Sequence, residues 1–230
     1  ECQPGEEAQV DFGVGAPVVG ADGRVRRPWV CRLSLSHSRK GYSEAAYQQS
    51  TENFIRILEN AFRAFGGVPV ALCIDNLRAA VSRADWYEPD LNPKLASFCR
   101  HYGVAILPAR PRRPQDKGKI EAGVKYVKNN ALKARRFASL AEQNRFLADW
   151  ERGVADRRIH GTTRKQVAAL FELERPHLKA LPPDLFPCFD EGRRIVQRDG
   201  FVEVRGAYYE VPAQHIGMSL WVRWDARMVR

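Results

Sequence analysis

Paired cysteines, zinc-binding motifs and long apolar runs are all missing from this sequence of 230 residues. Its five cysteines include no C-x-x-C pair and its five histidines no H-x₃-H pair, which argues against a disulfide framework and a structural zinc site. No apolar stretch approaches the roughly 20 residues of a membrane span, and no signal peptide is visible. We therefore expect a globular, cytoplasmic protein with reduced thiols at Cys2, Cys31, Cys73, Cys99 and Cys188.

Acidic residues are scarce relative to basic ones. The chain has 27 Asp and Glu against 37 Lys and Arg, a formal net charge of +10. Such an excess predicts an anionic partner, with nucleic acid first and an anionic membrane surface second, although a basic balance can also serve solubility alone. The excess is concentrated between Pro108 and Arg136, where ten basic residues face two acidic ones. A solvated helix needs no such bias, whereas a DNA-binding cleft does.

The first part of the chain predicts an α/β domain. Ala8, Val10 and Phe12 alternate with polar residues, and an Asp-Gly turn follows at 22–23. The elements expected there are antiparallel strands at 8–13, 29–35 and 42–47, a helix at 51–65 capped by Ser50 or Thr51, a buried strand at 68–74, a helix at 93–102, a strand at 104–107 and a long helix at about 115–133. This order predicts a ribonuclease-H-like mixed sheet with flanking helices over residues 1–137.

The remainder of the chain changes character twice. Residues 138–189 are expected to form a helical and proline-rich connector, helical from Ser139 to about Leu173. Residues 190–230 alternate as short strands joined by Asp-Gly and Arg-Gly turns, which predicts a small β-barrel. Its core is expected to include the aromatic residues Tyr208, Tyr209, Trp221 and Trp224. Since the chain begins at Glu1 and stops within a strand pattern, we expect it to be part of a longer protein.

Three carboxylates stand at positions that can meet in such a fold. Asp11 lies on the polar face of the first strand, Asp75 directly follows the buried strand, and Glu121 falls on the long helix. Taken singly, each is more simply a turn, cap or solvated residue. Together they suit phosphodiester chemistry, which uses two divalent cations about 3.5–4 Å apart. Carboxylate oxygens are the ligands that Mg²⁺ and Mn²⁺ prefer, so the triad predicts a catalytic site with two such ions.

The helix around Glu121 carries two parallel stripes. The apolar stripe, which can pack on the sheet, consists of Ile120, Val124, Val127 and Ala131. The charged stripe, which suits a metal ligand beside a phosphate track, consists of Lys117, Glu121, Lys125 and Lys128. Surface Glu–Lys pairs worth a few tenths of a kcal/mol are the simpler alternative. The candidates for DNA binding are Arg110, Arg112, Arg113, Lys117, Lys119, Lys125 and Lys128, with Arg158, His160 and Arg164 as weaker ones.

The stretch from Pro111 to Glu121 resembles the P-x-x-P-Q-x-x-G-x-x-E segment of retroviral-type integrases and related insertion-sequence transposases. The segments 5–13, 75–81, 117–121 and 158–163, and later Leu181-Pro-Pro, are similar to the core of the IstA-type transposases. The resemblance implies a D-D-E active site formed by Asp11, Asp75 and Glu121. It also implies an upstream helix-turn-helix region and a separate IstB-type ATPase partner, which fits the absence of a G-x-x-x-x-G-K loop here.

The function implied is a bacterial transposase that cleaves 3′ ends of transposon DNA and transfers them into target DNA. Self-association on the DNA is expected, since two ends must be joined, and the DNA-bound form would be associated with the nucleoid. Two alternatives remain open at this point. One is a ribonuclease-H-like nuclease or resolvase that only hydrolyses, and the other is an inactive DNA-binding protein derived from a transposase. The intact triad argues against the second.

Overall fold

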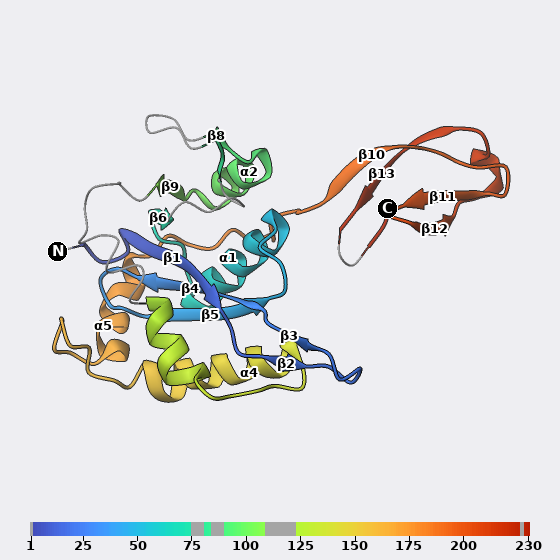
Figure 1. Ribbon diagram of the computed structural model, residues 1–230. Coiled ribbons are helices and arrows are strands. Elements are labelled where there is room, and N and C mark those ends of the chain that lie inside the picture. The colour runs from blue at the N-terminus through green and yellow to red at the C-terminus, as the bar shows by residue number, and fades with distance from the viewer. Residues whose placement is uncertain (1, 75–80, 84–89, 109–122, 226–227) are drawn as a thin grey trace. The chain divides into compact units, whose positions relative to one another are not determined.

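A computed structural model gives the arrangement of the chain (Figure 1). It describes residues 2–74, 81–83, 90–108, 123–225 and 228–230. The chain divides into two compact units, Glu1–Phe186 and Pro187–Arg230. None of the described helices is both long and apolar enough to cross a membrane.

A five-stranded mixed sheet forms the centre of the first unit, in the order β5-β4-β1-β6-β9. Its strands are β1 (Glu7–Val14), β4 (Trp29–Leu35), β5 (Gly41–Ala46), β6 (Ala71–Ile74) and β9 (Ala105–Pro108). β1, β4 and β5 are antiparallel, whereas β6 is parallel to both β1 and β9. The predicted three antiparallel strands and the mixed α/β class are confirmed.

Two short hairpins accompany the sheet. β2 (Val18–Val19) pairs with β3 (Val25–Arg26) around the predicted Asp-Gly turn, and β7 (Val81–Arg83) pairs with β8 (Asp90–Leu91). The buried strand is shorter than predicted, because β6 begins only at Ala71. Val70 is 46% exposed, and Val68 instead forms an isolated bridge with Lys179.

The helices α1 (Thr51–Phe65) and α2 (Pro93–Tyr102) match their predictions. The Ser50 side chain accepts a hydrogen bond from the Asn53 N–H at 3.2 Å and caps α1, which ends at Gly66 in the left-handed region. The apolar side of α1 includes fully buried Phe62 and Leu58. α2 packs on α1, with the rings of Phe62 and Phe98 5.9 Å apart.

The helices after β9 begin on the opposite face of the sheet, whereas the last α-helix packs on α1, with the rings of Phe171 and Phe65 6.4 Å apart. Residues 123–127 are helical and continue into the π-helical turn η1 (Lys128–Leu132). They are followed by α4 (Leu140–Trp150), a second π turn η2 (Glu151–Ala155), α5 (Val167–Glu174) and the short 3₁₀ helix η3 (Arg175–His177). The prediction of one helical stretch from Ser139 to Leu173 was wrong in its middle. Residues 156–166 are not helical, since Gly161 and two threonines form a turn closed by a bridge between Ile159 and Gln166.

Polar side chains of α4 and α5 form hydrogen bonds with the sheet and with residues next to its strands. On α4, the Asn144 side chain bonds both the N–H and the carbonyl of Ala45 on the edge strand β5, at 2.7 and 3.1 Å. On α5, the buried Glu174 carboxylate accepts from the N–H groups of Gly5 and Ser38 at 3.0 and 2.9 Å. Both helices therefore share one compact unit with the sheet, while the functional division after residue 137 stays a prediction.

The described residues of the second unit form short strands and a 3₁₀ turn, η4 (Ala213–His215). The strands are β10 (Asp190–Ile195), β11 (Phe201–Val204), β12 (Ala207–Glu210) and β13 (Ser219–Trp224), paired as β10-β13 and β11-β12. Its β-rich character is confirmed. The expected aromatic core was largely wrong, because Tyr208 is 66% and Trp221 63% exposed while Trp224 is buried beside Val222. Two-stranded sheets bury few positions, so most of these rings stay outside.

Candidate active site

Asp11 lies near the middle of β1, the central strand of the sheet. Ala8 and Val10 are fully buried on one face, and strand alternation places Asp11 with Gln9 on the other. The Asp11 carboxylate is half-buried and accepts a hydrogen bond from the Phe12 N–H at 2.7 Å through Oδ1. Flanking strands on both sides hold this backbone, so the carboxylate has a rigid base.

The parallel pairing of β1 and β6 bears on the second carboxylate. Val10 of β1 is in register with Ile74 of β6, and each is followed in the sequence by an aspartate. Asp75 itself lies outside the described residues. The described register therefore ends at the pair that directly precedes both aspartates in the sequence.

The helical residues 123–127 pack directly against the strand that carries Asp11. A Cβ atom added at Gly13 would lie 2.3 Å from Cγ1 of Val124, so the helix approaches β1 as closely as a glycine permits. Gly123 lies over β4, where an added Cβ would meet Cδ of Arg32 at 3.5 Å. Glu121 precedes Gly123 by two residues and lies outside the described residues.

The described residues of the two predicted stripes show the expected burial. Val124, Val127 and Ala131 are buried, while Lys125 and Lys128 are exposed. The remaining DNA-binding candidates lie outside the described residues: Arg110, Arg112, Arg113, Lys117 and Lys119. Among the described residues no group of three or more potential metal ligands occurs, and of the three carboxylates Asp11 alone belongs to them. Convergence of the triad stays a prediction.

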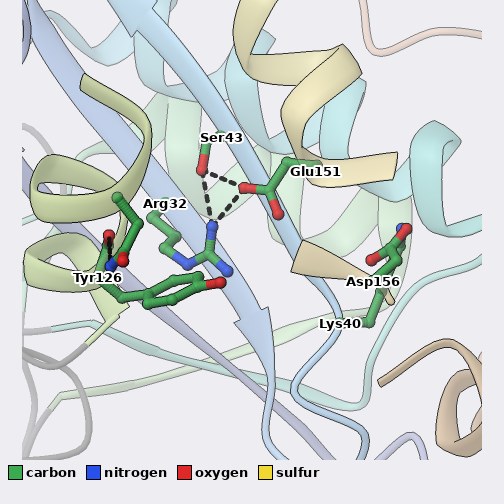
Figure 2. A network of polar contacts seen from close by, with 7 residues as sticks. Arg32, Lys40, Ser43, Tyr126, Glu151 and Asp156 are labelled. Atoms are coloured by element: carbon green, nitrogen blue, oxygen red, sulfur yellow. Dashed lines mark hydrogen bonds and ion pairs between the residues drawn. The ribbon is translucent and has the colours of Figure 1, made fainter. Parts of the chain in front are cut away.

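A buried polar network lies beside Asp11 on the same face of the sheet (Figure 2). Arg32, the register partner of Asp11 on β4, is 3% exposed and pairs with Glu151 of η2, which is 4% exposed. Ser43 of β5 joins them, since its Oγ accepts from the Arg32 guanidinium at 2.9 Å and donates to Glu151 at 2.6 Å. Gly41 makes room for this, because an added Cβ would lie 2.2 Å from Nη2 of Arg32.

Sequence reasoning missed this network. Its signal was present, because Arg32 is the charged residue of the mainly apolar strand Trp29-Val-Cys-Arg-Leu-Ser-Leu35. A charged residue there is buried only with a partner. Its partner Glu151 is 119 positions away in the sequence, so the pair could not be identified without the fold.

Tyr126 connects the network to the segment after η2. The Arg32 guanidinium lies 5.9 Å from the centre of the Tyr126 ring, and the Arg158 guanidinium 3.6 Å from it. Arg158, a weaker DNA-binding candidate, therefore packs on an aromatic ring. His160 accepts a hydrogen bond from the Thr162 N–H at 3.3 Å, and burial, reinforced by the Arg158 and Arg39 charges, lowers its pKa.

Thiol chemistry has no support at this site. Cys31, on the strand next to β1, is fully buried, and burial followed by the charges of Glu44 and Asp11 raises its pKa well above the ordinary value. Burial likewise raises the pKa of Cys99 to about 11. These thiols stay protonated near neutral pH, whereas a nucleophilic cysteine needs a lowered pKa.

Comparisons with known proteins agree with this geometry. Residues 2–114 match the integrase core domain family, and residues 181–230 match the Mu transposase C-terminal domain family. The chain is 36% identical over 228 residues to a putative transposase for insertion sequence IS408 of Burkholderia multivorans, covering 95% of this chain and 43% of that protein. It is 33% identical to the transposase for insertion sequence element IS21 of Pseudomonas aeruginosa, covering 97% and 57%.

The chain thus spans about half the length of the curated relatives that it matches. A cryo-EM structure of a simian T-cell lymphotropic virus intasome in complex with PP2A regulatory subunit B56 gamma is similar at a TM-score of 0.52 and 12% identity, covering 100% of this chain and 79% of the other. That similarity concerns the fold, whose ribonuclease-H-like class it confirms. The predicted resemblance to insertion-sequence transposases with an integrase core is confirmed.

Proposed function

This chain is a relative of the insertion-sequence transposases that carry an integrase core, and from that premise we propose that it cuts and joins DNA strands. The observation that carries the proposal is the position of Asp11. It lies on the central strand, one residue past the Val10–Ile74 register pair, on the face covered by the helix that follows Glu121 in the sequence. This is the position that the first aspartate of a D-D-E site requires, and Asp11 is the triad member that the structure describes.

The donor set fits divalent cations. Asp11, Asp75 and Glu121 offer only carboxylate oxygens, the hard ligands that Mg²⁺ and Mn²⁺ select. We propose that they hold two such ions. When bound, the ions would activate the attacking oxygen and stabilise the leaving oxygen of a phosphodiester.

The proposed chemistry consists of two successive reactions, during which side chains of the protein hold the DNA in position. In the first, water attacks a phosphodiester at the transposon end and leaves a free 3′-hydroxyl. In the second, that hydroxyl attacks a target phosphate, so one phosphodiester bond is exchanged for another without a nucleotide. Lys125 and Lys128 are exposed on the covering helix. We propose that they hold DNA phosphates, as do the basic candidates of 110–119, which lie outside the described residues.

Partners follow from this activity. Transposon-end and target DNA are the substrates, and self-association on DNA brings two ends together. An IstB-type ATPase would supply target selection, and the protein would act in the bacterial cytoplasm, at the nucleoid when bound to DNA.

The test is a reaction on branched DNA that mimics the strand-transfer product, with Mg²⁺ or Mn²⁺. We expect metal-dependent cutting and rejoining that is lost in Asp11→Asn, Asp75→Asn and Glu121→Gln. Glu172→Gln, at an exposed carboxylate on α5, serves as the matched control and keeps full activity.

The alternatives give different products. Cutting without rejoining by the wild type would identify a nuclease or resolvase. DNA binding with neither reaction, in the presence of either metal, would identify a DNA-binding protein and overturn the proposal.

A further inference from the structure

A hollow of about 490 Å³ lies at the end of β1. It is bounded by residues 14–17 on one side and by the turn after η1 on the other. The basic residues that line it are Arg27, Lys128, Lys133, Arg135 and Arg136. None of the lining residues that the structure describes is acidic. Walls of a single sign focus the electrostatic field and attract anions.

The turn that carries most of this charge is held in one conformation. The Phe137 N–H donates to the Pro17 carbonyl at 3.1 Å, and the Val19 N–H donates to the Phe137 carbonyl at 2.8 Å. Ala134 has a φ of 60°, a left-handed conformation that a non-glycine residue keeps only where its surroundings impose it. The Arg135 guanidinium lies 4.4 Å from the centre of the Phe146 ring. The charges are therefore presented by a preorganised backbone.

Within the described residues, these five basic side chains form no ion pair with a carboxylate. All five side chains are exposed, and the ion pairs formed between described residues involve none of them. By contrast, Arg26 on the neighbouring hairpin pairs with Asp22 at 3.0 Å. As far as the described residues go, the hollow can thus accept an external anion without displacing an internal carboxylate.

The hollow is close to Asp11 along the chain. Val14, which lines it, lies three residues beyond Asp11 on the same strand. An extended strand rises about 3.3 Å per residue, which gives a separation of about 10 Å. Each nucleotide of B-form DNA advances about 3.4 Å along the helix axis, so this distance spans at most about three nucleotides.

We propose that the hollow binds the phosphate backbone of DNA within about three nucleotides of the phosphodiester that reacts at Asp11. The site rests on the proposed function and adds to it a fixed contact that sets where the substrate strand lies. Backbone phosphates carry no sequence information, so this contact fixes register and orientation for any sequence.

The first test measures the salt dependence of duplex DNA binding by fluorescence anisotropy in EDTA, where no strand is cut. Each phosphate contact contributes about 0.9 to the slope of log K against log salt concentration. The double variant Lys133→Gln/Arg136→Gln should lower that slope by about 2. The matched control Arg63→Gln/Arg100→Gln removes the same charge from exposed positions on α1 and α2 and should keep the wild-type slope.

Equal reductions of the slope in both double variants would show that only net charge matters and would overturn the proposal. An unchanged slope in the hollow variant, with strand cutting intact in the wild type, would overturn the hollow but leave the proposed function standing. A wild type that binds no DNA would instead contradict the proposed function. Thermal melting of each variant verifies that it is folded.

The second test locates the contact. Lys133→Cys is reacted with duplexes that carry a thiol-reactive group on one phosphorothioate, moved stepwise from the reactive phosphodiester, with the wild-type chain as background. We expect a maximum of cross-linking within about three nucleotides of that phosphodiester. A flat profile, together with competition by inorganic phosphate as effective as that by DNA, would identify a small-anion site. Tighter binding of an RNA duplex of equal length would overturn the assignment to DNA.

Discussion

On one face of the five-stranded sheet, Val10 and Phe12 of β1 pack toward α1, with the rings of Phe12 and Phe54 5.9 Å apart. On the other face, Asp11 and its register partner Arg32 lie under the helix at 123–127. Apolar burial stabilises the first face in proportion to area and tolerates repacking. The second face contains a buried ion pair, whose desolvation offsets much of its attraction. On this second face the ion pair thus contributes less to net stability than the apolar side chains around it, and more to the fixed positions of charged groups.

The largest expected effect separates function from stability on a single strand. Asp11→Asn removes the charge of a proposed metal ligand and should lower strand cutting about 1000-fold, equivalent to roughly 4 kcal/mol of transition-state stabilisation. Its melting temperature should stay within a few degrees of the wild type. Gln9→Ala, on the same face of β1, is the control and should retain activity. Comparable activity losses in both variants would mean that this face serves structure alone.

The next effect concerns the ion pair below the covering helix. Arg32→Met leaves Glu151 buried without its cation and should cost about 3–5 kcal/mol in urea unfolding. The double variant Arg32→Met/Glu151→Leu removes both charges and should recover most of that loss. Additive losses in the double variant would show that the two side chains stabilise the fold independently.

A smaller loss in the free energy of unfolding is expected at Glu174, whose buried carboxylate accepts from backbone N–H groups and not from a guanidinium. Glu174→Gln replaces a charged acceptor of two N–H groups by an amide with one oxygen and should cost about 1–3 kcal/mol. Glu172→Gln, on the exposed side of the same helix, should change the free energy of unfolding by less than about 0.5 kcal/mol. A loss at Glu174 no larger than that at Glu172 would contradict this role.

The smallest effect is a pH dependence. The pKa of His160 is lowered in the folded protein, so the unfolded chain binds a proton more readily as the pH falls. Stability should therefore decrease as the pH drops through about 6.5, the ordinary value for histidine, toward the lowered one. The difference in melting temperature between wild type and His160→Gln should depend on pH in this interval. A constant difference from pH 7.5 to 5.5 would exclude the histidine as the source.

The elements that the sequence predicts well are those with local signals. α1 has its serine cap and terminal glycine, and β1 its alternation of Ala8, Val10 and Phe12. Asp11 could be selected because its neighbours define which face it occupies. The network of Arg32 and Glu151 could not, since it depends on contacts between distant segments. The break at 156–166 was missed because helical periodicity outweighed the turn residues, and the exposed Trp221 because size was taken for burial.

Gly13 determines how closely the helix at 123–127 approaches the face of β1 that carries Asp11. Because the covering helix touches the strand where a glycine has no side chain, position 13 sets the clearance between two rigid elements. Any larger residue would have to widen that clearance, and a displacement of about 1 Å can cost a reaction about 100-fold. A single uncharged methyl group at this position would then lower the rate through geometry alone. Under the proposed function, sensitivity to mutation would extend beyond the acidic residues to the contact between this strand and its covering helix.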